Sequence, residues 1–113
     1  MSQPVLLKVY GNLHPADAAD FEALSRASAS CVGEGAEPPV TLAGDRLRIS
    51  FEGLYFPVDE VLEALAALLK PRQQGKLDVL DLDAWRLTRH LFQDGRITSR
   101  SAPLNNVLDF SGH

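Results

Sequence analysis

Three aspartates close together in the sequence are the residues best suited to acid–base chemistry. Asp78, Asp81 and Asp83 form the densest cluster of carboxylates in the chain. On a strand, Asp81 and Asp83 share one face, where neighbouring carboxylates can raise one another's pKa enough for proton transfer. On a helix, the three would only complement the positive end of the helix dipole. The strand interpretation makes His90 and one of these aspartates candidates for a cofactor-free enzyme or a small-molecule or metal binder.

A second group of side chains suits the binding of anions. Basic residues are interleaved with Trp85 and Phe92 between residues 85 and 100. Arginine and aromatic side chains can hold a nucleic-acid strand through phosphate contacts and base stacking. However, the net charge of the chain is −4, which is far from that of a dedicated nucleic-acid binder. We therefore expect this stretch to meet a protein partner or a second copy, with weak binding of RNA or single-stranded DNA as the less favoured alternative.

The chain end is the third feature that could take part in binding. Leu104, Val107, Leu108 and Phe110 lie among turn-forming residues, and the chain stops at His113. This pattern predicts a strap that packs across the sheet or onto a second subunit and carries His113 with it. The candidate binding residues are therefore Arg86, Arg89, His90, Arg96, Arg100, Phe110 and His113.

The spacing of histidines and glycines does not indicate a metal or a phosphate loop. No two of His14, His90 and His113 are three or four residues apart, and no cysteine stands beside them. Gly33 and Gly35 lack the third glycine and the following Lys-Ser/Thr of a phosphate-binding loop. We expect neither a metal nor a cofactor.

Length, composition and charge set the broad class. The 113 residues are 45% hydrophobic and 23% charged, which predicts one α+β domain over residues 1–113. We expect no membrane helix and no signal peptide. Cys31 is the only cysteine, so nothing indicates an oxidising compartment, and we expect a cytoplasmic protein. Residues 1–69 hold ten acidic and four basic residues, whereas residues 70–100 hold four acidic and seven basic ones. Such an asymmetry suits an oriented encounter with a partner.

Three segments give clear predictions of secondary structure. Residues 5–10 predict a central strand that closes at Gly11-Asn12. A helix should begin near Pro15 and fade before Gly33, and the apolar stripe of residues 58–69 predicts a second helix.

Residues 40–51 predict a β-hairpin. With Gly44-Asp45 as a two-residue turn, three pairs of residues face one another: Val40 with Ile49, Thr41 with Arg48, and Leu42 with Leu47. The register leaves Arg46 and Arg48 on the face opposite to the apolar side chains.

Residues 77–100 allow two interpretations. The apolar spacing of residues 77–91 fits a helix, whereas the aromatic and threonine residues and Asp94-Gly95 fit strands, which we favour. The strand interpretation has a bulge near Asp83-Ala84 and a three-residue loop at 93–95, so that Leu91 pairs with Ile97. Its core face holds Trp85, Leu87, Leu91 and Ile97, and its outer face holds Arg86, Thr88, His90, Thr98 and Arg100.

The predicted order of elements is β-α-β-β-α-β with an added C-terminal hairpin strand. It resembles the split βαβ, ferredoxin-like pattern in topology. The resemblance implies an antiparallel sheet with two helices on one face. From the strand interpretation of residues 85–100, we expect arginines along the other face. Because this fold hosts unrelated functions, it implies no activity. With no catalytic motif in the sequence, we expect a small intracellular binding module, for a protein partner or for itself.

Overall fold

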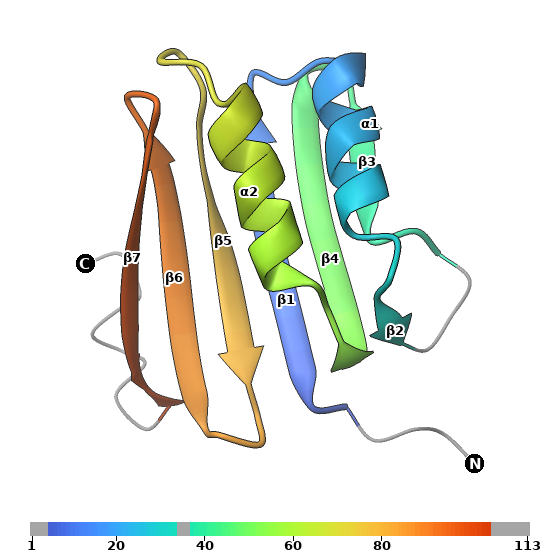
Figure 1. Cartoon of the computed structure of the whole chain (residues 1–113), viewed down its shortest axis with the longest axis vertical. Helices are drawn as coiled ribbons and strands as arrows, with labels where there is room; N and C mark the ends of the chain where they lie inside the picture. Colours follow the sequence, from blue (N-terminus) through green and yellow to red (C-terminus); the bar gives the residue numbers. More distant parts are fainter. Residues whose placement is uncertain (1–4, 34–36, 105–113) are drawn as a thin grey trace.

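Seven strands and two helices make up the protein in a computed structural model, which describes residues 5–33 and 37–104 (Figure 1). In chain order the elements are β1 (Leu7–His14), α1 (Ala18–Ala27), β2 (Val32–Gly33), β3 (Val40–Ala43), β4 (Arg46–Tyr55), α2 (Val58–Leu68), β5 (Gln74–Asp81), β6 (Arg86–Gln93) and β7 (Arg96–Pro103). The fold is α+β, as the sequence predicts, and none of the described helices is long and apolar enough to cross a membrane.

The strands form one open antiparallel sheet, and both helices cover the same face of it (Figure 1). The strand order is β2-β4-β1-β5-β6-β7, and β3 pairs with β4 as well. The core lies between the helices and the sheet, where Val9, Leu24, Ile49, Val61 and Leu65 are almost completely buried. The predicted central strand is confirmed, since β1 lies between β4 and β5.

β1 is longer than the sequence predicts. It continues past Gly11-Asn12 to His14, so the predicted end at that pair is wrong. A Cβ atom at Gly11 would lie 2.7 Å from the carbonyl oxygen of Lys76 on β5. Gly11 therefore permits a close approach of two strands instead of ending one.

The first hairpin and the two helices agree with the sequence. Val40 faces Ile49, Thr41 faces Arg48 and Leu42 faces Leu47, which confirms the predicted register. α1 begins with a capping box in which Asp17 accepts from the backbone N–H of Asp20. The helix predicted from the apolar stripe forms α2 and buries Val61 and Leu65.

The second hairpin consists of strands, but its predicted register is wrong by one residue. Asp94 and Gly95 have φ angles of 56° and 74°, and they form a two-residue turn that pairs Phe92 with Ile97. Because side chains alternate along a strand, this shift reverses the faces predicted for β6. Leu87 and Leu91, predicted on the core face, lie on the side away from the helices, and Arg86 and Thr88, predicted on the outer face, lie on the helix side. Ile97 on β7 stays on the helix side, as predicted. The predicted bulge is also wrong, since β5 and β6 are separate strands joined by residues 82–85.

Trp85 and His90 are not where the sequence placed them. Trp85, predicted in the core, lies in the β5–β6 turn with a φ of 57°, and it is 57% exposed. His90, predicted on the outer face, is 8% exposed on the helix side of the sheet, in register with Leu77 and Ser99.

Candidate functional site

The sheet face opposite to the helices is strongly cationic. We call it the open face, because no helix or strand of residues 5–33 and 37–104 lies on it (Figure 1). Within residues 5–33 and 37–104, strand alternation places seven basic residues and two carboxylates on the open face, which is a net charge of +5 in a chain of net charge −4. These residues are Lys8, Arg46, Arg48, Lys76, Arg89, Arg96 and Arg100, with Glu52 and Asp78.

An ion pair near the middle of the open face neutralises part of this charge. Arg89 faces Asp78 across β6 and β5 and donates two hydrogen bonds to it, from Nε to Oδ1 at 2.7 Å and from an Nη atom to Oδ2 at 3.0 Å. The hydrogen bonds to Asp78 raise the pKa of Arg89 above its usual range. Lys76 Nζ lies 3.9 Å from Asp78 Oδ2, at the limit of an ion pair. Asp78 is therefore held within the open face by Arg89.

Tyr10 and Glu52 form the second polar pair of the open face. The Tyr10 hydroxyl donates a hydrogen bond of 2.5 Å to Oε2 of Glu52. Partial burial, together with the hydrogen bond and the negative charge of Glu52, raises the pKa of Tyr10 to about 12. Tyr10 stays protonated at neutral pH and offers a ring that is 36% exposed on the central strand.

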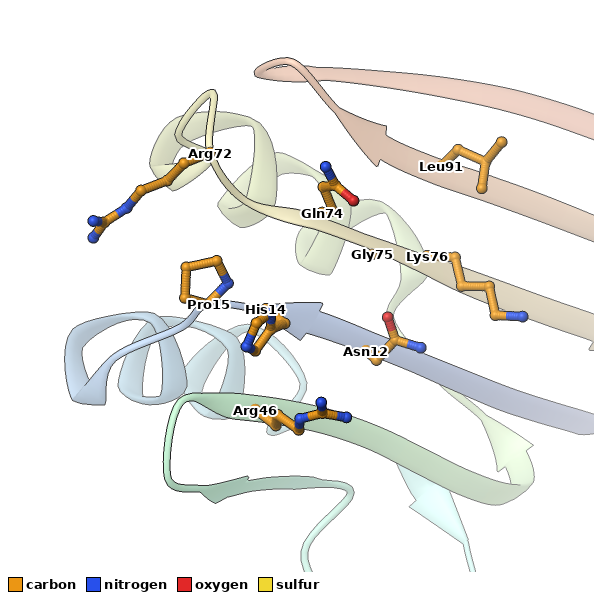
Figure 2. A pocket seen from close by; sticks show the side chains of 9 residues that line it. All are labelled: Asn12, His14, Pro15, Arg46, Arg72, Gln74, Gly75, Lys76 and Leu91. Carbon is orange, nitrogen blue, oxygen red and sulfur yellow. The ribbon is translucent and has the colours of Figure 1, made fainter.

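A hollow of about 570 Å³ lies at the end of the open face where β1 finishes (Figure 2). Three cationic side chains line it: Arg46 on β4, Arg72 in the α2–β5 connection and Lys76 on β5. None of the described residues that line it carries a carboxylate. The remaining lining residues are Asn12, His14, Pro15, Gln74, Gly75 and Leu91. The cationic lining makes this hollow a candidate site for a small anionic group.

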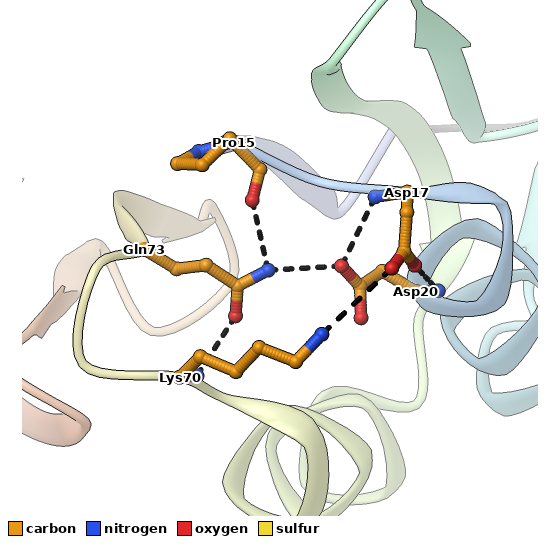
Figure 3. A network of polar contacts seen from close by, with 5 residues as sticks. All are labelled: Pro15, Asp17, Asp20, Lys70 and Gln73. Atoms are coloured by element: carbon orange, nitrogen blue, oxygen red, sulfur yellow. Dashed lines mark hydrogen bonds and ion pairs between the residues drawn. The ribbon is translucent and has the colours of Figure 1, made fainter.

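A buried polar network fixes the loop at the rim of the hollow (Figure 3). Gln73 donates from Nε2 to the carbonyl oxygen of Pro15 and to Oδ2 of Asp20, each at 2.9 Å. Its Oε1 accepts from the backbone N–H of Lys70, also at 2.9 Å. Because Gln73 follows Arg72 and Pro15 lines the hollow, the network holds both walls of the rim in place.

The structure disperses the predicted site residues. Arg89 and Arg100 are cross-strand neighbours on the open face, and Arg96 is exposed at the start of β7. Arg86 lies on the other side of β6, where its Nε donates to Ser101 Oγ at 3.3 Å. Phe110 and His113, with the rest of the predicted strap after Leu104, lie outside the described residues.

His90 and the aspartate cluster do not meet at one place. The Nδ1 atom of His90 lies 2.7 Å from Ser99 Oγ on the helix side, and burial lowers the pKa of His90. Asp78 points to the open face, Asp81 accepts from the backbone N–H of Ala84, and Asp83 is exposed in the turn. In the described part of the chain, no three histidine, cysteine or acidic residues are grouped to hold a metal ion.

Sequence reasoning missed Lys8, Arg46, Arg48, Arg72 and Lys76 as candidate binding residues. The register of the first hairpin already placed Arg46 and Arg48 on an outer face, which was a usable signal. Their proximity to Lys76 follows only from the strand order, because β1 separates β4 from β5 in the sheet.

The fold and the site define an α+β protein with a cationic open sheet face. No family model, no curated protein and no solved structure gives a significant match to this chain.

Proposed function

We propose that this protein is a binding module whose open face takes up an acidic surface of a protein partner. The observation that carries the proposal is the net charge of +5 on the open face of a chain that is acidic as a whole. Complementary charge steers association and fixes orientation more than it adds affinity. A cytoplasmic setting, expected from the single cysteine, belongs to the same proposal.

The architecture that presents the open face fits the ferredoxin-like arrangement, which we include in the proposal. What supports this part of the proposal is the strand order β3-β4-β1-β5, with α1 and α2 on one face of the sheet. β6 and β7 then extend the sheet at the β5 edge by a hairpin. The extension lengthens the open face and adds Arg89, Arg96 and Arg100 to it.

A second copy of the chain also presents an acidic surface, so it is one candidate partner under the same proposal. The exposed acidic residues of the helical layer are Asp17, Glu22, Asp59, Glu60 and Glu63. A contact between this layer and the open face of another copy is heterologous and does not close by itself. Light scattering at low salt should then give a mass well above 12.3 kDa that falls as salt is added. A constant monomer mass would remove the second copy as the partner.

The test uses a defined acidic probe. The ¹⁵N-labelled full chain is titrated with a poly-L-glutamate peptide, and separately with single-stranded DNA of equal charge, at physiological salt. We expect the peptide to shift the backbone amide signals of β1, β4, β5 and β6 and to bind more tightly than the DNA. Tighter binding of the DNA than of the peptide would overturn the proposal of a protein partner and would indicate nucleic acid as the ligand.

A matched pair of variants separates the open face from the overall charge. Arg48→Gln removes a cation from the open face, whereas Arg26→Gln removes one from the exposed end of α1. We expect the first variant to weaken peptide binding about fivefold, which corresponds to ~1 kcal/mol, and the second to leave it unchanged. Equal weakening by both variants would overturn the proposal.

A further inference from the structure

We infer that the hollow between Arg46, Arg72 and Lys76 is a subsite for a phosphoryl group. The inference rests on the proposed function, because it names the ligand chemistry of one part of the open face. The phosphoryl group can come from a phosphorylated side chain of the partner or from a free phosphorylated small molecule, and the test below distinguishes these sources.

The charges that line the hollow suit an anion. Arg46 and Arg72 make no ion pair or side-chain hydrogen bond with another residue of the described chain. Among the residues that the structure describes, Lys76 pairs with Asp78 alone, at 3.9 Å, and Asp78 is already held by two hydrogen bonds from Arg89. Three cations therefore surround a space in which none of the described lining residues supplies a compensating carboxylate.

The number of charges favours a phosphoryl group over a carboxylate. One guanidinium can satisfy a carboxylate through two parallel hydrogen bonds, whereas a phosphate dianion presents three oxygens and up to two charges. Arg46 and Arg72 supply planar sets of donors, and Lys76 supplies a compact charge. Three cations on three separate segments match the higher charge of the phosphoryl group.

Neutral donors and an apolar wall complete the hollow. Asn12 and Lys76 face one another across β1 and β5, and Figure 2 shows the guanidinium of Arg46 extending from β4 toward Asn12. Leu91 and Pro15 add apolar surface. A volume of about 570 Å³ exceeds what a phosphate ion needs and lies within the usual range for small-molecule sites. The phosphoryl group is therefore expected to be part of a larger ligand.

The scaffold around the hollow is preorganised. The Gln73 network ties the loop that carries Arg72 to the start of α1. At Gly75 a Cβ atom would lie 2.0 Å from the carbonyl oxygen of Asn12, so the approach of β1 and β5 leaves no room for a side chain at this position. A site on rigid strands loses little conformational entropy when a ligand binds.

The experiment titrates the ¹⁵N-labelled full chain at constant ionic strength with three probes. These are inorganic phosphate, a short phosphoserine peptide and the same peptide with glutamate in place of phosphoserine. We expect saturable shifts of the Asn12, Gly75 and Leu91 amide signals with the first two probes, and weaker shifts with the glutamate peptide. Tighter binding of the phosphoserine peptide than of phosphate indicates a phosphorylated side chain as the source. Equal or tighter binding of phosphate alone indicates a free phosphorylated small molecule.

Variants of the lining residues test whether the hollow binds the phosphorylated probes. We expect Arg46→Gln and Lys76→Gln each to weaken binding of the phosphorylated probe about tenfold, and Lys76→Arg to restore most of it. Arg26→Gln, which removes a charge from the helical layer, should change nothing. Equal shifts with the glutamate peptide, or equal weakening by Arg26→Gln, would overturn the inference. If poly-L-glutamate still binds the open face in that case, the proposed function survives and only the phosphoryl subsite fails.

Discussion

Nε2 of Gln73 lies 2.9 Å from Oδ2 of Asp20 and joins the loop before β5 to the first turn of α1. The two side chains are 1% and 3% exposed, so this contact is shielded from water. Asp20 also accepts from the backbone N–H of Asp17, and Lys70 Nζ lies 3.7 Å from Asp17 Oδ2. The Gln73 side chain thus joins the β1–α1 connection to the α2–β5 connection, and residues of both connections line the cationic hollow.

Replacing Gln73 by alanine should destabilise the fold. The change removes two donated hydrogen bonds and one accepted bond, and it leaves the buried Asp20 carboxylate without one of its partners. We expect a loss of ~2–4 kcal/mol in the free energy of unfolding, measured by urea denaturation. Gln74→Ala is the matched control, because Gln74 is exposed, and it should cost less than ~0.5 kcal/mol. Equal losses in the two variants would contradict the role of the network.

The first hairpin shows how much of the fold the sequence can predict. Alternating apolar residues and a Gly-Asp turn specify the same register independently, so the pairing of Val40 with Ile49 is correct. The apolar stripe of α2 is equally unambiguous, since Val61 and Leu65 recur at helical spacing. In both segments the local pattern and the buried face agree.

The second hairpin shows where such reasoning fails. The sequence is compatible with a three-residue loop at residues 93–95 and with a two-residue turn at Asp94-Gly95. The two connections turn opposite faces of β6 toward the core. Strand alternation predicts Trp85 on the core face, but a tryptophan with a positive φ in a turn has no signature in the sequence. The cationic hollow was equally hidden, because Arg46 and Lys76 are brought together only by the position of β1 between their strands.

The exposure of Trp85 can be checked by fluorescence. Trp85 is the single tryptophan of the chain and is 57% exposed in the native state. Its emission maximum should therefore lie close to that of the urea-unfolded chain, and iodide should quench it in both states to a similar degree. A strong red shift of the emission maximum on unfolding would contradict the exposed position of Trp85 in the β5–β6 turn.

The stability of the fold should decrease as the pH falls from 7.5 to 5, because of His90. Burial lowers the pKa of His90 below its usual 6.5, against smaller opposite effects of Asp78 and Asp59. Between the folded pKa and 6.5 the unfolded chain binds more protons, so stability rises with pH in this window. The contribution of His90 is present above 6.5 and is lost as the pH falls toward the folded pKa.

His90→Gln isolates this effect in urea denaturation at pH 7.5 and pH 5. Glutamine can keep a hydrogen bond to Ser99 but does not titrate, so the variant should lose less stability than the wild type over this range. The hydrogen bond from the backbone N–H of Asp20 lowers the pKa of Asp17 below its usual 3.8. The stability that Asp17 contributes is therefore lost only below pH 5, outside the range of this measurement. Identical pH profiles of variant and wild type would rule out His90 as the titrating group.

Asp78→Asn should move stability and binding in opposite directions. The carboxylate accepts two hydrogen bonds from Arg89, and the two side chains are 14% and 20% exposed. The amide keeps a single oxygen acceptor and no charge, so we expect a loss of ~1–2 kcal/mol in the free energy of unfolding. The same change removes one negative charge from the open face, so the net charge of the face becomes more positive. Binding of poly-L-glutamate should therefore become about threefold tighter, as measured by titration.

Arg89→Gln is the counterpart that separates charge from folding in this prediction. It breaks the same pair with Asp78, so it should also lower the free energy of unfolding, but it removes a positive charge from the open face. Binding of poly-L-glutamate should become weaker in this variant and tighter in Asp78→Asn, although both unfold more easily. Weaker binding in both variants would mean that the geometry of the pair, rather than the charge of the open face, controls the interaction.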